Sequence, residues 1–440
     1  MPQRNLLILM IGVVIGYVCF LCGEPNTFAR YVARSLTQIH SGSLEHVPNQ
    51  ELFNAAMNGM VDVLHKHGDE HSQFISRDDA DPFRAEMRQQ FGGIGVRIHF
   101  QGNPPQLVIV GTPDPGTPAA GSQIRAGDHV LAIDDRPTGG MTMSDVLHAM
   151  RGDPGQSVRL TIEHVAGERP ETVALVRDVI VVDSILGDRR TAEGGWEFRL
   201  AENPEIAQVR IAAFGNKTAD ELARVLTKLT HDGAQAAVLD LRDNPGGALD
   251  AAVAICDMFL PTGLAIVETR GRDGTVRARY TTSGKGQFQK LPLAVLVNQN
   301  SASASEIVAA CLQDHHRAAI IGQRSYGKGT VQQLIPIESG QSLLKLTSAS
   351  YWRPSGKNIH RRPDATDADD WGVSPDPDLE IALDDKAYEA YVKYRDDRDL
   401  FQPPAEKPMA TPHEKPDADA FTDRPLHSAV DYLRDKFSIN

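Results

Sequence analysis

Three serines stand at alternate positions where an apolar strand pattern gives way to a helical one, in the stretch NSASASEIVAACLQD at residues 300–314. A serine hydroxyl at the start of a helix has two uses. Ser303 and Glu306 have the S-x-x-E spacing in which a hydroxyl and a carboxylate satisfy free amides of the first helical turn. Such a hydroxyl can also act as a nucleophile, held at a helix N-terminus. The stretch alone leaves both uses open.

Lys328 is a residue that could activate such a hydroxyl, and it lies in the turn YGKG. A lysine accepts a proton only when desolvation lowers its pKa toward neutrality. Apolar strand patterns flank this turn, which favours partial burial. Gln332 lies four residues further on, so in an extended strand its neutral amide would share a face with Lys328 and could orient the amine. An exposed turn lysine is the alternative.

The same turn also fits the G-x-x-x-x-G-K frame of a phosphate-binding loop, at Gly322, Gly327 and Lys328. That motif requires Ser or Thr at the next position to hold magnesium, and Gly329 stands there. The following TVQQLIPI alternates like a strand, whereas a phosphate loop opens a helix. We therefore expect no nucleotide and no other cofactor here.

Two glycine-rich stretches could present backbone amides to a negative charge. NPGG, at residues 244–247, follows a buried strand pattern, and its amides could form an oxyanion hole with the amide after the nucleophile. In FGGIGV, the glycines Gly92, Gly93 and Gly95 could let a backbone nest capture a terminal carboxylate. Each stretch taken alone is also an ordinary turn.

The rest of the chain supplies the elements that would position these residues. Residues 25–90 have helical apolar spacing. Residues 91–180 alternate short β-rich runs with Gly and Pro turns, typical of a small barrel. Residues 181–385 alternate strands with longer helices, which is an α/β pattern. Residues 386–440 form a Pro-rich linker and then an amphipathic helix.

The N-terminus predicts membrane attachment. Residues 6–22 are uncharged and largely apolar, which is just long enough to span a bilayer, and no A-x-A cleavage signal follows. We therefore assign residues 1–24 to a signal anchor, with a signal peptide or a buried core helix as alternatives. Charge leaves the orientation open, because Arg4 favours one direction and Arg30 and Arg34 the other.

Composition narrows the possible partners. The 440 residues carry a net charge of -13 with no compensating basic run, which argues against a nucleic-acid partner. His65, His67 and His71 lie close together and could suggest a metal. The glycine and acids around them favour a solvated helix end, so we expect no metal site.

In combination these stretches resemble the carboxy-terminal processing (tail-specific) serine peptidases. The landmarks of that family stand here in order as FGGIGV, DLRDNPGG, SASASEI, YGKGTVQ and PSGKNI…WGVSPDPD. They extend from about residue 69 to residue 381, and the combination is specific although each piece is common. One departure is the connector at residues 185–209, which is longer than usual and leaves the hinge geometry open.

The resemblance implies a role for each candidate residue. By position, Ser303 is similar to the nucleophile, Lys328 to the general base and Gln332 to the residue that orients this base. Gly247 and Ala304 match the oxyanion-hole amides. The residues that match the carboxylate-binding loop of the PDZ domain are Gly93, Ile94, Gly95 and Val96.

The resemblance also implies the fold and the function. The fold would be α/β, a crotonase-like (ClpP/crotonase-type) serine protease core with an inserted PDZ domain and helical terminal segments. The PDZ domain would recognise the exposed C-terminus of a protein or peptide substrate, with a regulatory or adaptor protein as a further partner. A Ser–Lys dyad would cleave peptide bonds without a metal or nucleotide. The alternative is a PDZ scaffold that binds C-termini without cutting.

Catalytic domains of this kind are usually exported. The resemblance and the apolar N-terminus together predict a single-pass protein of the cytoplasmic (inner) membrane whose catalytic domain is periplasmic.

Overall fold

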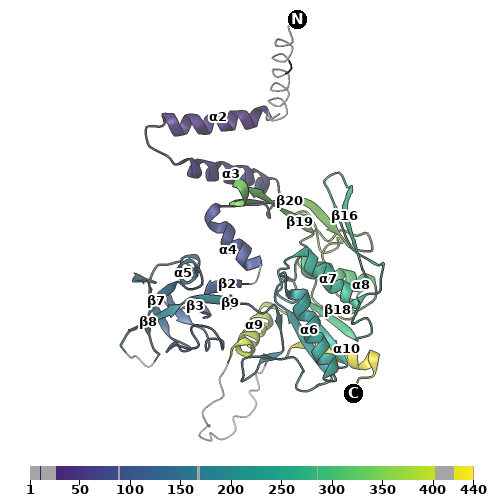
Figure 1. Ribbon diagram of the computed structural model, residues 1–440. Coiled ribbons are helices and arrows are strands. Elements are labelled where there is room, and N and C mark those ends of the chain that lie inside the picture. The colour runs from purple at the N-terminus through teal and green to yellow at the C-terminus, as the bar shows by residue number, and fades with distance from the viewer. Residues whose placement is uncertain are drawn as a thin grey trace. The chain divides into compact units, whose positions relative to one another are not determined.

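A computed structural model describes Met10 and residues 26–87, 90–165, 169–284, 286–401 and 421–439 of the chain. The chain divides into two compact units. The first unit consists of Met1–Arg77 and Leu334–Leu346, and the second of Asp78–Gln333 and Thr347–Asn440. Figure 1 labels the elements of both units.

The first unit is built on two helices and a short strand, α2 (Thr27–Gly42), α3 (Asn49–Lys66) and β1 (Gln73–Ile75). Met57 and Val61 lie one turn apart on α3 and are buried against Phe74 of β1. β1 pairs antiparallel with the first residues of β20 (Ser342–Trp352). The helical pattern predicted for residues 25–90 is therefore interrupted by a strand, and it resumes in α4 (Arg77–Met87).

The second unit begins with a small β-domain. Its elements are β2 (Gln90–Gly93), β3 (Ile98–Gln101), β4 (Gln106–Ile109), β5 (His129–Ile133), β6 (Arg136–Pro137), α5 (Met143–Met150), β7 (Ser157–Glu163), β8 (Glu171–Val176) and β9 (Asp178–Val181). The main sheet has the antiparallel order β3-β4-β5-β7-β8, and β2 pairs separately with β9. Val158, Leu160 and Ile162 of β7 are buried while their neighbours are more exposed, so one face of the sheet forms the core.

A mostly parallel sheet forms the larger part of the second unit. Its strands in spatial order are β10 (Ile185–Leu186), β13 (Ile206–Ile211), β14 (Ala236–Asp240), β17 (Leu293–Val297) and β18 (Ala319–Gly322), and only β10 is antiparallel. Every residue of β14 and β17 is buried. Strands covered on both faces are expected in parallel sheets, and this explains their continuous apolar sequence.

Alternate residues of these strands face two different helix layers. Leu239 and Val295 pack with α6 (Thr218–His231), α7 (Leu249–Phe259) and α8 (Ala304–Asp314). Val238 and Ala294 pack on the other face with α10 (Arg424–Phe437). The four helices lie around the sheet in Figure 1. Because β14 and β17 are adjacent and parallel, the loops after them emerge side by side at one edge.

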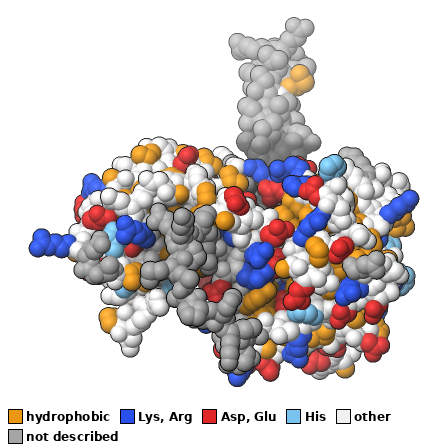
Figure 2. Space-filling model, turned by 90° about the horizontal axis from the view of Figure 1, so that it is seen from below, with side chains coloured by type: hydrophobic (Ala, Val, Ile, Leu, Met, Phe, Trp, Pro, Cys, Tyr) orange, Lys and Arg blue, Asp and Glu red, His pale blue; other side chains and the backbone are white. Residues whose placement is uncertain are grey.

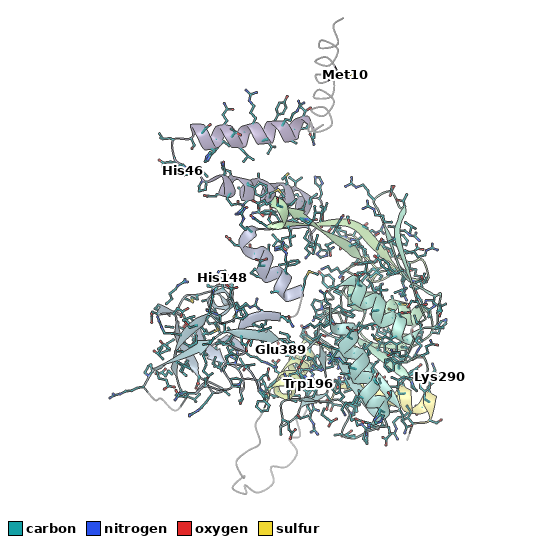
Figure 3. All side chains as sticks on the ribbon, viewed as in Figure 1. Met10, His46, His148, Trp196, Lys290 and Glu389 are labelled. Carbon is teal, nitrogen blue, oxygen red and sulfur yellow. The ribbon has the colours of Figure 1, made fainter. Side chains whose placement is uncertain are left out.

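The remaining elements are distributed over the two units. They are β11 (Arg189–Arg190), β12 (Trp196–Glu197), β15 (Ala265–Arg270), β16 (Val276–Thr281), β19 (Thr330–Ile337), a 3-10 turn η1 (Glu338–Gly340) and α9 (Asp385–Asp399). The long connector seen in the sequence forms a hairpin of β11 and β12. Trp196, labelled in Figure 3, is on this hairpin, and the Arg190 guanidinium lies 4.3 Å from its ring centroid.

The predicted location, a single-pass protein of the inner membrane with a periplasmic catalytic domain, is contradicted. In the part of the chain that the structure describes, no helix is long and apolar enough to cross a membrane. The anchor predicted at residues 6–22, and the Pro-rich residues 402–420, lie outside the described residues.

The face drawn in Figure 2 is mixed in charge. Acidic and basic side chains of the described residues are interspersed over it. Within the described ranges, no group of three or more His, Cys, Asp or Glu side chains is placed to hold a metal ion. Of the three clustered histidines, His65 uses its Nε2 atom in a 2.8 Å hydrogen bond with the Ser72 carbonyl oxygen.

Candidate active site

The loops after β14 and β17 are joined by hydrogen bonds at the carboxyl edge of the sheet. The carbonyl oxygen of Asn244 accepts from the amide of Ala302 and from the hydroxyl of Ser305, both at 3.0 Å. The hydroxyl of Ser301 donates to the Leu241 carbonyl oxygen at 2.8 Å. Ser301 and Ser305, two of the three alternating serines, therefore use their hydroxyls to join the NPGG loop to the SASASE loop.

Ser303 differs from these two neighbours. Its side chain donates to no acceptor among the residues that the structure describes. It precedes α8 with φ 55° and ψ -111°, a backbone conformation that L residues rarely adopt, and it is 8% exposed. A Cβ atom placed on Gly246 would lie 2.8 Å from Ser303 Cβ and 3.0 Å from the Ala304 amide nitrogen. The backbone of the NPGG loop thus touches Ser303, and only glycine fits there.

The two amides assigned to an oxyanion hole flank this contact. Gly247 has φ 146°, and a Cβ atom there would lie 2.1 Å from the Phe214 carbonyl oxygen. The amide of Phe214 donates to Gly246 at 3.0 Å, and Ala248 donates to Phe214 at 2.7 Å, so the loop is fixed on both sides of Gly247. Ala304 begins α8, where the first amides have no acceptor within the helix.

One buried carboxylate joins the serine loop to the lysine turn. Glu306 Oε2 accepts from the amides of Ser303 and Lys328, both at 2.8 Å. Its Oε1 accepts from the Gly327 amide and the Ser325 hydroxyl, both at 2.6 Å. Because the amides of Ser303 and Lys328 meet at one oxygen atom, their nitrogens are at most twice 2.8 Å apart. Residues distant in the sequence are thereby held at one point.

The environment of Glu306 perturbs its ionisation. Burial raises the pKa of Glu306 to about 7, although the four hydrogen bonds act to lower it. All four bonds are donated to the carboxylate, which suits its ionised form. The S-x-x-E spacing predicted a bond between Glu306 and the Ser303 amide, and this bond is present. The three bonds to the turn at Ser325, Gly327 and Lys328 could not be read from spacing, because they come from another segment.

Lys328 and Gln332 have different surroundings in the structure. The backbone of Lys328 is held beside Ser303, and its side chain is half-buried. A Cβ atom on the next residue, Gly329, would lie 2.1 Å from the His360 amide nitrogen, so close backbone packing also holds this turn. Gln332 is half-buried in β19, and its amide donates to Thr330 Oγ1 at 2.8 Å. Its predicted orienting role stays a prediction.

The predicted carboxylate loop lies in the β-domain. Gly93 pairs with Asp178 in the β2–β9 ladder, and Ile94 is buried in the domain core at 2% exposure. Gly95 has φ 77°, and a Cβ atom there would lie 2.3 Å from Thr117 Cβ. Val96 packs partly against the same core. The fold thus fixes the conformation of the loop, and its ligand stays a prediction.

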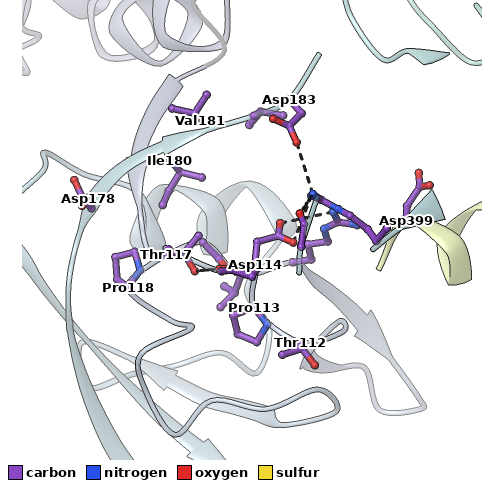
Figure 4. A pocket seen from close by; sticks show the side chains of 18 of the residues that line it. Thr112, Pro113, Asp114, Thr117, Pro118, Asp178, Ile180, Val181, Asp183 and Asp399 are labelled. Atoms are coloured by element: carbon purple, nitrogen blue, oxygen red, sulfur yellow. Dashed lines mark hydrogen bonds and ion pairs between the residues drawn. The ribbon is translucent and has the colours of Figure 1, made fainter. Parts of the chain in front are cut away.

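A cavity of about 660 Å³ adjoins this loop. Its lining includes residues 95–97, residues 112–118, strand β9 and the connector hairpin. Figure 4 shows this cavity, with Asp114 and Asp183 among its side chains. Arg190 of the hairpin forms ion pairs with Asp114 at 3.4 Å and with Asp183 at 3.7 Å. The connector hairpin therefore builds part of the cavity wall.

Comparison with known families gives two matches. Peptidase family S41 matches residues 205–378, which contain the NPGG, SASASE and YGKG landmarks. The PDZ domain matches residues 109–164, within the small β-domain.

Curated relatives match over a longer span. A carboxy-terminal-processing protease of Bartonella bacilliformis is 36% identical over 348 residues, which is 78% of this chain and 73% of that protein. A carboxyl-terminal-processing protease of Synechocystis is 32% identical and covers 67% of this chain and 64% of its own length. Among solved structures, the photosystem II D1 C-terminal processing protease is 26% identical, covers 79% of this chain and 86% of its own, and has a TM-score of 0.43.

These matches define a serine-type peptidase core together with a PDZ domain. The chain belongs to peptidase family S41, in the carboxy-terminal-processing group.

Proposed function

We propose that this chain is an endopeptidase that uses Ser303 as its nucleophile and Lys328 as its general base. The α/β core that carries them is of the crotonase-like type. The proposed segments are an N-terminal helical part at residues 25–90 and the PDZ domain at residues 91–180. The peptidase core follows at residues 181–385, and the linker with the C-terminal helix at residues 386–440.

The observation that carries this proposal is the convergence on Glu306. Its carboxylate binds the amide of Ser303 and the amide of Lys328 through the same oxygen atom. Gly246 lies against Ser303 from the other side. Three sequence landmarks therefore meet within a few ångströms, which a PDZ scaffold without catalysis would not require.

The proposed reaction starts with the Ser303 hydroxyl. The neutral amine of Lys328 takes its proton while Oγ attacks the carbonyl carbon of the scissile peptide bond. The amides of Gly247 and Ala304 donate to the oxygen on which negative charge develops. Lys328 then passes the proton to the leaving amine, and an acyl-enzyme forms on Ser303. Water hydrolyses this ester by the same proton route.

Gln332 would orient the Lys328 amine. It would do so without adding a charge that favours the protonated form.

The PDZ domain would bind the C-terminal carboxylate of the substrate at its glycine loop. Loops of this kind hold a terminal carboxylate through successive backbone amides. Gly93, Ile94, Gly95 and Val96 form this loop in the proposal. A protein with an unstructured, apolar C-terminus is thus the expected substrate class.

The test is cleavage of an unstructured protein with an apolar C-terminus by the wild-type chain, Ser303→Ala and Lys328→Ala. We expect both substitutions to lower the rate by about 10⁴-fold or more. Lys290→Ala removes an exposed lysine, labelled in Figure 3, and serves as the matched control with unchanged activity. Cleavage at the wild-type rate by both active-site variants would remove the dyad. Binding of the substrate by the wild type without any cleavage would favour the PDZ scaffold.

A further pair of substrates tests the PDZ role. The same peptide is supplied with a free C-terminal carboxylate or with a C-terminal amide. We expect the amide to raise KM and to leave kcat nearly unchanged, because the carboxylate contact lies outside the reacting bond. Equal KM values for the two peptides would exclude recognition of the carboxylate.

A further inference from the structure

A buried arginine connects the NPGG loop with the C-terminal helix. Arg242 precedes Asn244 by two residues, and its side chain is 2% exposed. Its NH1 and NH2 atoms donate to the two carboxylate oxygens of Asp423, at 2.8 and 2.9 Å. Its Nε and NH2 atoms donate to Asp240 at 2.9 and 2.7 Å. The guanidinium is thus held between a strand residue and a residue near the end of the chain.

Asp423 is itself held firmly. It is the N-cap of α10 and accepts from the Leu426 amide at 3.1 Å. The helix that follows, α10, buries Ala429 and Leu433 against the face of the sheet that carries Val238 and Ala294. Asp423 is 3% exposed, so its position is determined by the packing of the whole helix. The helix and its cap therefore act as a fixed point for Arg242.

The charges in this cluster depend on one another. Burial alone would raise the pKa of Asp240, but the Arg242 guanidinium and its hydrogen bonds hold this pKa below its usual range. Burial would lower the pKa of Arg242, but Asp240 and Asp423 together keep it well above its ordinary value. A buried ion pair that loses one partner leaves an uncompensated charge, which is strongly unfavourable. Removal of the Asp423 charge should therefore force Arg242 to move.

Movement of Arg242 would reach the oxyanion loop through a short covalent path. The side chain of Asn244 accepts from the Gly246 amide at 2.8 Å and donates to the Ile211 carbonyl oxygen at 2.6 Å. Its carbonyl oxygen holds Ala302 next to Ser303. A shift two residues upstream therefore displaces both the Gly246–Gly247 backbone and the serine loop.

We infer that Asp423 is a positioning residue of the peptidase reaction, which acts through Arg242 on the oxyanion loop. The C-terminal helix is then a part of the active-site support, contributed by a residue that lies 181 positions further along the chain than Arg242. This inference rests on the proposed function. It assigns a role in the reaction to a segment outside the residues matched by the peptidase family.

The experiment compares Asp423→Asn, Asp423→Glu, Asp431→Asn and Leu433→Ala in the full-length chain. Asp423→Asn keeps the shape but places an amide against the guanidinium, so we expect kcat to fall about 10- to 100-fold and KM to change less than about twofold. Asp423→Glu restores the charge and should recover part of kcat. Asp431 is exposed on the same helix, and its substitution should leave both constants unchanged.

Leu433→Ala separates positioning from stability. It opens a cavity under α10 but keeps the Asp423 carboxylate, so it should lower Tm at least as much as Asp423→Asn while kcat stays close to wild type. For both variants, kcat and KM are measured at a temperature well below the Tm of either variant. A wild-type kcat in Asp423→Asn, or an equal loss of kcat in Leu433→Ala, overturns the inference. Activity that survives Ser303→Ala overturns the proposed function, and this inference with it.

Discussion

The glycine loop beside Ser303 and the glycine loop of the PDZ domain are held by different interactions. At residues 244–247, buried side chains fix the backbone, through the Asn244 amide and the charged contacts of Arg242. At residues 93–96, strand pairing with β9 and contact with Thr117 fix it. Polar bonds made in a buried site demand close geometry, whereas pairing at a short two-stranded ladder allows adjustment. Under the proposed function, the loop beside Ser303 therefore has the stiffer support and the proposed carboxylate-binding loop has the softer one.

Among the substitutions that test this comparison, the largest effect should come from one that breaks the stiffer loop at residues 244–247. Gly246→Ala would bring a methyl group to 2.7 Å from the Ala302 carbonyl oxygen and 2.8 Å from Ser303 Cβ, so the amides proposed for the oxyanion hole must shift. We expect kcat to fall about 10²- to 10³-fold. Gly155→Ala, at a PDZ glycine with φ 90° and no atom near its Cβ position, is the control for backbone strain alone. A kcat loss of similar size in the control would contradict the comparison.

Glu306→Gln should have the next largest effect. One accepting oxygen becomes an amide group that faces N–H and O–H donors, so two buried donors lose their acceptor. Each buried donor without an acceptor costs about 1–3 kcal/mol, so the free energy of unfolding should fall by about 2–6 kcal/mol. Urea unfolding measures this change. Glu389→Gln, at an exposed residue of α9 labelled in Figure 3, is the matched control.

The pH dependence of stability should reveal the same carboxylate. The pKa of Glu306 is about 7 in the folded chain and has an ordinary value of 4.5. Between these values the folded state keeps a proton that the unfolded state releases. The stabilising contribution is therefore complete below pH 4.5 and is lost as pH rises through 7, by about 3 kcal/mol. The difference between wild type and Glu306→Gln should change over this range. A constant difference would contradict the assignment.

A smaller effect is expected when the softer loop is changed. Gly95→Ala forces a methyl group against Thr117 at φ 77°. We expect KM to rise about tenfold for substrates with a free C-terminal carboxylate, with kcat within about twofold, because the chemical groups remain in place. Gly140→Ala, at a PDZ glycine with φ 87° and open space, should leave KM unchanged. A fall in kcat instead of a rise in KM would show that this loop belongs to the catalytic support.

The smallest expected effect is a pH dependence of stability caused by one histidine of the PDZ domain. His164 Nδ1 lies 2.8 Å from Asp128 Oδ1, and its Nε2 lies 3.1 Å from Glu171 Oε1. The hydrogen bond with Asp128 raises the pKa of His164 above its ordinary value. Its contribution to stability is therefore complete below pH 6.5 and is lost as pH rises through the raised pKa. His164→Gln should remove this dependence, as followed by thermal unfolding of the wild type and the variant between pH 5 and 9.

The local sequence pattern was sufficient to predict some parts of the fold and of the candidate site. The buried strands β14 and β17 and the helix after Ser303 were predicted, because continuous apolar runs and a capping spacing are properties of neighbouring residues. The contact between NPGG and Ser303 arises because β14 and β17 are adjacent and parallel. The α/β sequence pattern predicts parallel strands, but it does not predict which strands are neighbours in the sheet. The predicted inner-membrane location is contradicted within the described residues, where no helix is long and apolar enough to cross a membrane.

Long-range polar contacts could not be predicted in this way. Glu306 was interpreted only as a helix cap, since the sequence does not reveal which other amides reach it. Asp423 resembles an ordinary N-cap of an amphipathic helix, and nothing near it indicates a bond with Arg242. One signal was available, because a carboxylate such as Glu306 within the apolar run of α8 must be buried and must find donors.

The unusual backbone of Ser303 has a consequence for substrate turnover. Its φ of 55° and ψ of -111° are unfavourable for an L residue, and folding, through the bond to Glu306, maintains them before any peptide arrives. In the proposed mechanism the Ser303 hydroxyl would therefore need little reorganisation on the way to the transition state, at a cost in the stability of the folded chain.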